Sequence, residues 1–245
     1  MTIKEIIMNA EVPAKTKTYC PIPHSVFLEE IVEKLTNNNI SIKSEYFAST
    51  AKGEIIRGTY KLAMENSYDA DINPSISFVN SYNKMRKASV VSGVMVLVCA
   101  NGMMRESGVN NSRKHSGDSA LEDFRAILDT SINSLESEFD ILRQNMQEMK
   151  NFTISDKHKA SMMGDMYLNY EMITPSQLAI FKKEDRESKN FTDDTVWSFY
   201  NNITESLKVS HPLHWDRDHA KVHSYISSQF DLTGDRKLYP KLWKD

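Results

Sequence analysis

Residues 90–99, Val-Val-Ser-Gly-Val-Met-Val-Leu-Val-Cys, are apolar at eight of ten positions, and the fold depends on this stretch. The run is far shorter than the roughly 20 apolar residues that span a membrane. It is rich in β-branched valine, which favours strands, and it lacks the alternation of a strand with one face in water. We therefore expect residues 90–99 to be the central strand of a sheet, buried on both faces.

Three segments before this run alternate between apolar and polar residues. The first starts at Ile40, the second covers 56–64 and the third covers 76–82. Such alternation is typical of antiparallel strands that bury one face and expose the other. Turn-forming residues separate the segments, at 50–53, 69–74 and 83–87. The sequence predicts a four-stranded antiparallel meander whose last strand is the buried run.

Helical patterns lie on both sides of the meander. Residues 1–23 have three prolines and little periodicity, so we expect an extended arm before a helix that Ser25 caps and that ends at 37–39. Apolar residues at steps of three and four from Leu121 to Met149 predict one amphipathic helix of about 30 residues. That helix either packs within the chain or forms an oligomer contact.

The remainder of the chain predicts helices only. Helical spacing covers 155–173, Pro175 marks the start of a second helix, 192–194 cap a third, and the last spans 215–230. We expect an α+β protein: an antiparallel β-meander with an N-terminal helix, a long amphipathic helix and a helical C-terminal half. The expected parts are 1–117, helix plus meander, and 118–245, long helix plus C-terminal helices, joined as one continuous domain.

Composition narrows the class of function. The 245 residues include 30 Lys and Arg against 33 Asp and Glu, a net charge of −3, and only eight glycines. No G-x-G-x-x-G fingerprint occurs. Gly53 and Gly58 have the spacing of a phosphate-binding loop, but Thr59 stands where that loop needs lysine. The sequence also presents no recognisable catalytic triad or carboxylate pair. It therefore favours a binding protein over an enzyme, without a cofactor.

The same features bear on the cellular compartment. The first residues lack the basic-then-apolar layout of a signal peptide, and no apolar run is long enough to cross a membrane. Two cysteines without a secretory signal favour a reducing compartment. We expect a cytoplasmic protein that does not contact a membrane.

Two basic clusters flank the predicted central strand. They consist of Lys84, Arg86 and Lys87 in the turn before it, and of Arg105, Arg113, Lys114 and His115 in the loop after it. Tyr68 and Tyr82 offer rings on which bases can stack. This combination indicates binding of single-stranded nucleic acid, with the cations on phosphates. The alternative is an ordinary solvated face, because acidic residues are interspersed in the same region.

A histidine group near the C-terminus is a second candidate site. His219 and His223 are one helical turn apart and could bind zinc or iron from one helix face. The alternative is a solvated helix start, in which the histidines point in several directions and no metal is bound. The sequence favours this alternative, because no glutamate or cysteine completes a familiar metal site.

Several short motifs resemble the phage/plasmid-like protein family, a family of domains of unknown function. They are Asn66-Ser67-Tyr68-Asp69, then Cys99-Ala100-Asn101-Gly102, then Lys114-His115-Ser116-Gly117, and finally a helical motif with Trp197, Tyr200, Asn201, Asn202, Thr204 and Glu205. The motifs span residues 66–205, and their order and spacing carry the resemblance. The family-motif positions are Asn66, Tyr68, Asp69, Cys99, Asn101, Gly102, Trp197, Asn201 and Thr204.

The resemblance implies a role in DNA metabolism, because such proteins occur among phage replication and recombination genes. The order of helix, meander and long helix is also similar in outline to phage single-strand annealing proteins. We therefore expect a single-stranded DNA-binding or annealing accessory protein that forms a homo-oligomer in the host cytoplasm. The alternative is a protein–protein interaction module that blocks a host enzyme or defence complex, through the long helix or through residues 162–170.

Overall fold

The computed structural model describes residues 2–65, 69–96, 101–105, 112–115, 117, 119–187, 190–211 and 214–243. The chain divides into two compact units. The first comprises Met1–Val94 and Gly108–Phe139, and the second comprises Met95–Ser107 and Asp140–Asp245. Each unit therefore combines two stretches that are distant in sequence.

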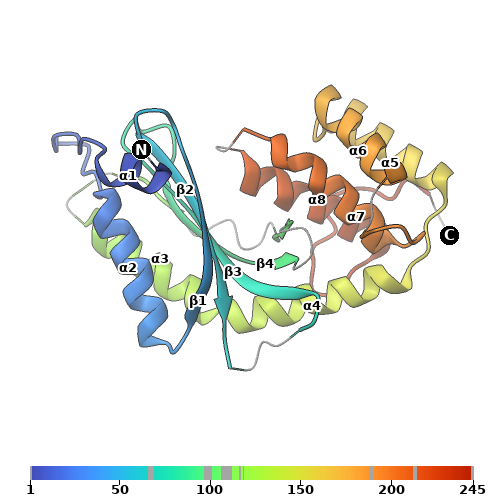
Figure 1. The fold of residues 1–245 in the computed structure, drawn as a ribbon, viewed down its shortest axis with the longest axis horizontal. Coiled ribbons are helices and arrows are strands. Elements are labelled where there is room, and N and C mark those ends of the chain that lie inside the picture. Colours follow the sequence, from blue (N-terminus) through green and yellow to red (C-terminus); the bar gives the residue numbers. More distant parts are fainter. Residues whose placement is uncertain are drawn as a thin grey trace. The chain divides into compact units, whose positions relative to one another are not determined.

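The predicted α+β fold with an antiparallel meander is confirmed (Figure 1). The strands are β1 (Ser41–Ser49), β2 (Ile55–Ala63), β3 (Ile72–Ser81), β4 (Ala88–Val96), β5 (Gly102–Met103) and β6 (Ser112–Arg113). Their order is β1-β2-β3-β4-β5, and β6 pairs with β4. The four predicted strands correspond to β1 to β4. The sequence does not predict β5 and β6, because a two-residue strand leaves no alternation to detect.

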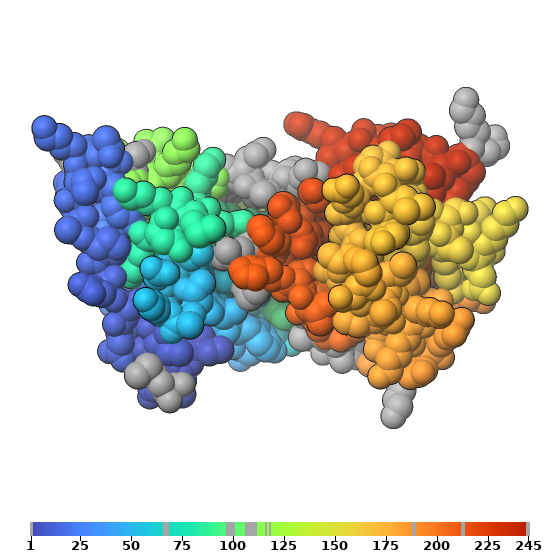
Figure 2. Space-filling model, turned by 90° about the horizontal axis from the view of Figure 1, so that it is seen from above, coloured from blue at the N-terminus to red at the C-terminus, as the bar shows by residue number. Residues whose placement is uncertain are grey.

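Two helices cover one face of the sheet in the first unit. They are α2 (His24–Asn37) and α3 (Ala120–Asn133), and they lie side by side in both views (Figures 1 and 2). Phe27 of α2 stacks on Phe124 of α3, with ring centroids 4.4 Å apart, and meets Phe78 of β3 edge-on at 6.0 Å. All three rings are buried, and burial of each such side chain stabilises the fold by about 1.5–3 kcal/mol.

The central strands are more deeply buried than alternation predicts. β4 is buried at all but one of its residues, which confirms the predicted central strand as far as Val96, and residues 97–99 lie outside the described part. The expected polar, exposed face of the third segment is wrong, because all ten residues of β3 are buried. β3 lies between β2 and β4, so both of its edges are paired as well. A hydrogen bond of 2.8 Å between Thr59 and Ser77 satisfies polar side chains there.

Three helix starts differ from the predicted ones. The expected arm contains α1 (Ile3–Met8), because Thr2 and Glu5 form a capping box at its N-terminus. Helix α2 begins at His24 after Pro23, so Ser25 is not its cap. Helix α7 (Val196–Ser206) is capped by Thr195, whose side chain accepts a hydrogen bond from the Ser198 N–H, and not by 192–194. Thr2 and Thr195 therefore cap α1 and α7 with their side chains, whereas Pro23 at the start of α2 makes no side-chain cap.

The single long helix predicted across 121–149 is wrong in detail. The segment forms α3 and α4 (Leu135–Asn151), which meet at Ser134. The Ser134 hydroxyl donates to the Ser131 carbonyl, and bonds of this kind compete with the helical ladder and bend helices. The predicted apolar stripe is buried within the chain. Its buried members are Phe124, Leu128, Ile132, Leu135, Phe139, Leu142, Met146 and Met149.

The second unit is largely helical, as predicted. Besides α7 it contains α5 (Asp156–Leu168), α6 (Pro175–Glu187), the short 3₁₀ helix η2 (Leu207–Val209) and α8 (Trp215–Phe230). Helix α6 packs along α7, where the rings of Phe181 and Phe199 meet at 90°. The bounds of α8 match the prediction, and eleven of its residues are buried. Among the described residues, the helices all lack the length and apolar character needed to cross a membrane.

Candidate functional site

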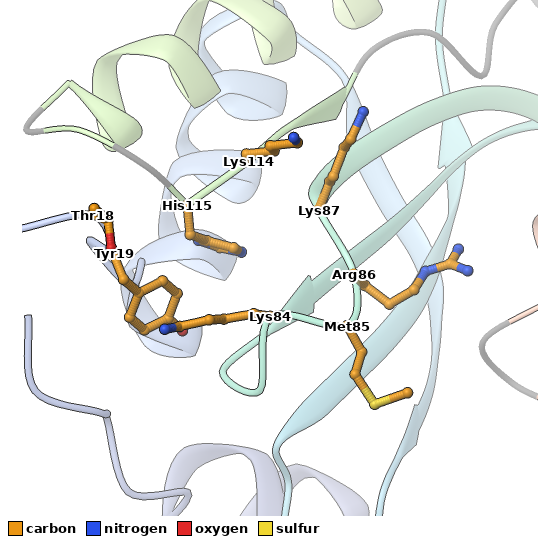
Figure 3. A pocket seen from close by; sticks show the side chains of 8 residues that line it. All are labelled: Thr18, Tyr19, Lys84, Met85, Arg86, Lys87, Lys114 and His115. Atoms are coloured by element: carbon orange, nitrogen blue, oxygen red, sulfur yellow. The ribbon is translucent and has the colours of Figure 1, made fainter. Parts of the chain in front are cut away.

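Three segments of the first unit enclose a pocket of about 360 Å³ (Figure 3). They are the loop before α2, the turn between β3 and β4, and the residues after β6. The volume is within the range of about 300–1,000 Å³ that is typical of small-ligand sites. As far as the structure describes it, the lining has four cationic side chains and no carboxylate, so it suits an anion. The lining residues are Thr18, Tyr19, Lys84, Met85, Arg86, Lys87, Lys114 and His115.

Pairing of β4 with β6 brings the two basic clusters together. Ala88 lies opposite Arg113, so the same antiparallel register places Lys87 opposite Lys114. The two lysine side chains lie next to each other at the rim of the pocket in Figure 3. Like charges directly opposite each other destabilise a sheet. Since no carboxylate of the described residues pairs with either lysine, an anion from outside would relieve their repulsion.

The turn between β3 and β4 is held by its own hydrogen bonds. The Ser81 hydroxyl donates to the Arg86 carbonyl at 2.8 Å and accepts from the Arg86 N–H at 3.2 Å. The Asn83 side chain accepts from the Met85 N–H at 3.2 Å. Lys84 has a φ of 63°, the left-handed region that non-glycine residues seldom adopt. This backbone directs the Lys84 side chain across the pocket, whereas Arg86 points away from it in Figure 3.

Tyr19 forms the floor of the pocket and is not among the residues predicted from the sequence. Its hydroxyl donates to the Tyr82 carbonyl at 2.7 Å, and the next residue, Cys20, donates its N–H to the His115 carbonyl at 3.0 Å. The Lys84 ammonium lies 4.5 Å from the centre of the Tyr19 ring, a cation–π distance. In the sequence, Tyr19 is merely an aromatic residue in a polar segment flanked by prolines. Nothing in that segment indicates which residues it contacts.

His115 forms a wall of the pocket, and its ring makes no hydrogen bond to any described residue. Its side chain is 94% buried, since only 6% is exposed, and its ring meets the Tyr19 ring edge-on at 6.0 Å. Neither ring nitrogen has a hydrogen-bond partner among the described residues. Burial lowers the pKa of His115, so its imidazole is neutral near pH 7. The ring points toward the space between Lys84 and Lys87 in Figure 3.

The buried side chain of His24 packs against Tyr82, the residue before the turn that lines the pocket. His24 stacks on Tyr82, with ring centroids 3.7 Å apart, and its backbone N–H donates to the Tyr82 hydroxyl at 2.7 Å. The Asn80 amide donates to one nitrogen of its ring, and the Gly53 carbonyl lies 2.8 Å from the other. Burial lowers the pKa of His24 to about 4, against the Gly53 hydrogen bond, and the charge of His115 adds to this shift. The ring is therefore neutral and fully hydrogen-bonded.

Of the two predicted stacking residues, the one that the structure describes, Tyr82, does not line the pocket. Tyr82 is 6% exposed, and its ring is covered by His24, so it supports the pocket without presenting a free face. Tyr68 lies outside the described residues. Among the described residues of the pocket, Tyr19 is the aromatic lining residue.

Two of the predicted cations have protein partners. Arg113 forms an ion pair of 2.9 Å with Asp123 of α3. Arg105 belongs to the second unit, is buried, and donates from Nε to Asp235 at 2.5 Å and from Nη2 to the Gly234 carbonyl. We therefore leave Arg105 out of the candidate interface. The structure groups Lys84, Arg86, Lys87, Lys114 and His115 in the pocket.

The Asp235 carboxylate is the centre of a buried polar cluster. Burial raises the pKa of Asp235, but the hydrogen bonds and charges of His223 and then of Arg105 outweigh it and hold the pKa well below its ordinary value. Its other oxygen accepts further hydrogen bonds. The donors to that oxygen are Asn145 at 2.8 Å, His223 at 2.9 Å and Ser227 at 2.9 Å.

The histidines of α8 are structural. The expectation of a solvated helix start is wrong, because His219 and His223 are fully buried. His219 Nδ1 donates to the Gly102 carbonyl at 2.7 Å, whereas His223 bonds Asp235, so the two rings serve different partners. Across the described residues, no three His, Cys, Asp or Glu side chains are placed to hold one metal ion.

Family-motif residues of the second unit contact one another. The Asn201 carbonyl accepts from the Asn101 side chain and from the Thr204 hydroxyl, each at 3.1 Å, and the Asn201 amide donates to the Trp197 carbonyl at 2.9 Å. A Cβ on Gly102 would lie 2.4 Å from the Trp215 ring, so only glycine fits there. These motif residues therefore hold elements of the second unit together.

Other motif residues belong elsewhere. Asp69 accepts from the Asp71 and Ile72 N–H groups before β3, as aspartate does in turns. Asn66 and Cys99 lie outside the described residues, like Tyr68.

Fold and site together define an α+β protein with an antiparallel meander, a helical second unit and a basic pocket at the turns of the sheet. The chain belongs to the family described as domain of unknown function DUF932, whose model matches residues 14–226. The resemblance to a family of domains of unknown function, predicted from the motifs, is thereby confirmed. No curated protein and no solved structure matches the chain significantly.

Proposed function

We propose that the protein binds single-stranded DNA through the basic pocket, as a phage-type accessory protein in recombination or replication in the host cytoplasm. One observation carries the proposal: the first basic cluster meets Lys114 and His115 of the second, across the whole of β4, in one recess with no carboxylate in its described lining. Phosphate contacts supply most of the sequence-independent affinity for nucleic acid. A net charge of −3 does not oppose this, because binding depends on the local field.

The shape of the pocket favours a single strand over a duplex. A recess of about 360 Å³ accepts one phosphate with part of its nucleotide. A flexible strand can turn one phosphate into such a recess, whereas a duplex presents its phosphates on a stiff outer surface. The exposed lysines 84, 87 and 114 surround the opening and would contact the neighbouring backbone.

The test is a salt titration of binding to a labelled single-stranded oligonucleotide. Each phosphate contact contributes about −0.7 to the slope of log affinity against log salt for a single strand. The double variant Lys87→Ala with Lys114→Ala should therefore bind more weakly at low salt, with a slope reduced by about 1.4. A duplex competitor should displace the strand poorly.

A charge-matched control is available on α6. Lys182 and Lys183 are exposed there, belong to the second unit and are not among the residues that line the pocket. The variant Lys182→Ala with Lys183→Ala loses the same charge and should keep the wild-type affinity and slope. Equal losses in both double variants would mean that only net charge matters, and no salt-dependent binding by the wild type would refute the proposal.

A further inference from the structure

The unpartnered imidazole of His115 indicates what kind of phosphate the pocket takes. A buried polar group without a hydrogen bond destabilises a protein by about 1–3 kcal/mol. Both ring nitrogens of His115 are in this state among the described residues, on a ring that is 6% exposed and that lines the pocket. A ligand that bonds this ring would recover the lost interaction, so the ring adds a preference beyond the general attraction of the lysines.

The ligand must complement a neutral imidazole, which has one N–H donor and one acceptor nitrogen. A phosphodiester inside a strand offers acceptor oxygens only, and carries no proton near neutral pH. A phosphate monoester has a second pKa of about 6, so it exchanges a proton in the range where imidazole does. As a dianion it accepts from the ring N–H, and as a monoanion it can instead donate its P–OH to the unprotonated ring nitrogen, which a phosphodiester cannot do.

The charge of the pocket also exceeds that of one phosphodiester. Lys84, Lys87 and Lys114 surround the His115 ring in Figure 3, and the described lining contains no carboxylate to offset them. A phosphodiester carries one negative charge, whereas a phosphate monoester carries about 1.5 to 2 at pH 7.

We propose that the pocket binds a phosphate monoester at the end of a nucleic-acid strand, with His115 and the paired lysines 87 and 114 recognising the terminal phosphate. This assignment rests on the proposed function. It adds that strand ends, rather than internal sites, are the preferred ligand.

The experiment compares three versions of one labelled oligonucleotide: with a 5′-phosphate, with a 3′-phosphate, and with neither. Fluorescence anisotropy with the full chain should show at least about tenfold tighter binding of one phosphorylated end, as expected for one additional charge-assisted hydrogen bond. Equal affinity of all three strands would overturn the inference while leaving single-strand binding in place.

Two variants separate recognition from folding. His115→Phe keeps a buried ring but removes both nitrogens, so the ratio of the affinities for the phosphorylated and the unphosphorylated strand should fall to about one. His115→Gln retains a donor and an acceptor and should recover part of the preference. A His115→Phe protein that keeps the full preference would overturn the role of this residue.

Competition identifies the source of the phosphate. A deoxynucleoside monophosphate and inorganic phosphate should compete far more weakly than the phosphorylated strand, because they lack the neighbouring backbone. Competition as strong as that of the strand would assign the pocket to free phosphates and overturn the assignment to strand ends. If no strand binds at all, the proposed function fails. NMR of the His115 ring with the monophosphate then decides separately whether the pocket takes a phosphate monoester.

Discussion

Lys87 and Arg105 are alike in sequence, since each is a cation in a basic cluster beside the central strand, but their surroundings in the two units are opposite. In the first unit Lys87 is exposed and lies opposite Lys114, another cation. In the second unit Arg105 is buried against the carboxylate of Asp235. The role of a cation is therefore decided by the residue that faces it in the structure. The sequence cluster to which it belongs does not decide it.

The two arrangements differ in what they do to stability. A buried charge loses its hydration, and only a well-placed partner with further hydrogen bonds compensates for this loss. Asp235 does so for Arg105, with three more donors on its second oxygen. Exposed lysines keep their hydration but repel each other. The first arrangement stabilises a unit, whereas the second leaves a repulsion that a bound anion would relieve.

Removing Asp235 should have the largest effect, because it leaves Arg105 buried without a counter-charge. Asp235→Ala is expected to lower the free energy of unfolding of the second unit by about 3–5 kcal/mol. Tryptophan fluorescence in urea measures this unit selectively, since all three tryptophans, at 197, 215 and 243, belong to it.

The matched control breaks an exposed ion pair of the same unit. Arg143 and Asp140 are 3.1 Å apart, and both side chains are exposed. Arg143→Ala should therefore change stability by less than about 1 kcal/mol. A similar, small loss for Asp235→Ala would show that the buried cluster does not hold the second unit together.

Acid should destabilise the two units in different pH ranges. Unfolded His24 has a pKa near 6.5, whereas burial lowers the folded pKa to about 4, so only the unfolded state gains a proton between these values. The first unit should therefore lose roughly 3 kcal/mol as the pH falls from 6.5 to 4. The pKa of Asp235 is lowered from 3.8, so its contribution in the second unit is lost only below about pH 4.

Hydrogen exchange of peptides from β2 and β3, corrected for the intrinsic effect of pH, follows the first unit. Tryptophan fluorescence follows the second. His24→Gln keeps a donor for Gly53 and an acceptor for Asn80 without a titrating ring, so it should flatten the dependence between pH 6.5 and 4. An unchanged slope in this variant would assign the acid sensitivity to other groups.

Most of the fold could be predicted because the spacing of apolar residues along a short segment already indicates a helix or a strand. The meander, the buried strand and α8 follow from residues whose neighbours in sequence are also their neighbours in the element. The wrong predictions concern the ends of helices. Ser25 and Ser134 are both polar residues in a helical pattern, but Ser25 does not cap α2, and Ser134 separates α3 from α4. Caps and bends depend on backbone angles that a pattern does not contain.

The candidate site was predictable only in part for a similar reason. The two basic clusters are visible in the sequence, but their meeting depends on the two-residue strand β6, which has no pattern. Arg105 and Lys114 could not be told apart, because the partner of Arg105 is 130 residues away. Tyr19 was missed because its contacts, Tyr82 and Lys84, lie more than 60 residues further along the chain.

The smallest expected effect is a gain in stability on removal of a charge. It tests most directly the contrast between Lys87 and Arg105. Lys87→Thr removes one of two like charges that face each other, so it should raise the free energy of unfolding of the first unit by about 0.2–1 kcal/mol. Hydrogen exchange of β4 peptides measures this gain. It should shrink at high salt, because salt screens exposed charges.

A double-mutant cycle with Lys114→Thr isolates the repulsion. Once either lysine is replaced, the second substitution should give little further gain, since the repulsive pair no longer exists. A loss of stability in either single variant would contradict the proposed strain, because it would mean that the lysines already have partners that hold them. For residues that serve a ligand, we expect the substitution to raise stability and weaken DNA binding. Replacing Arg105 should instead lower the free energy of unfolding of its unit.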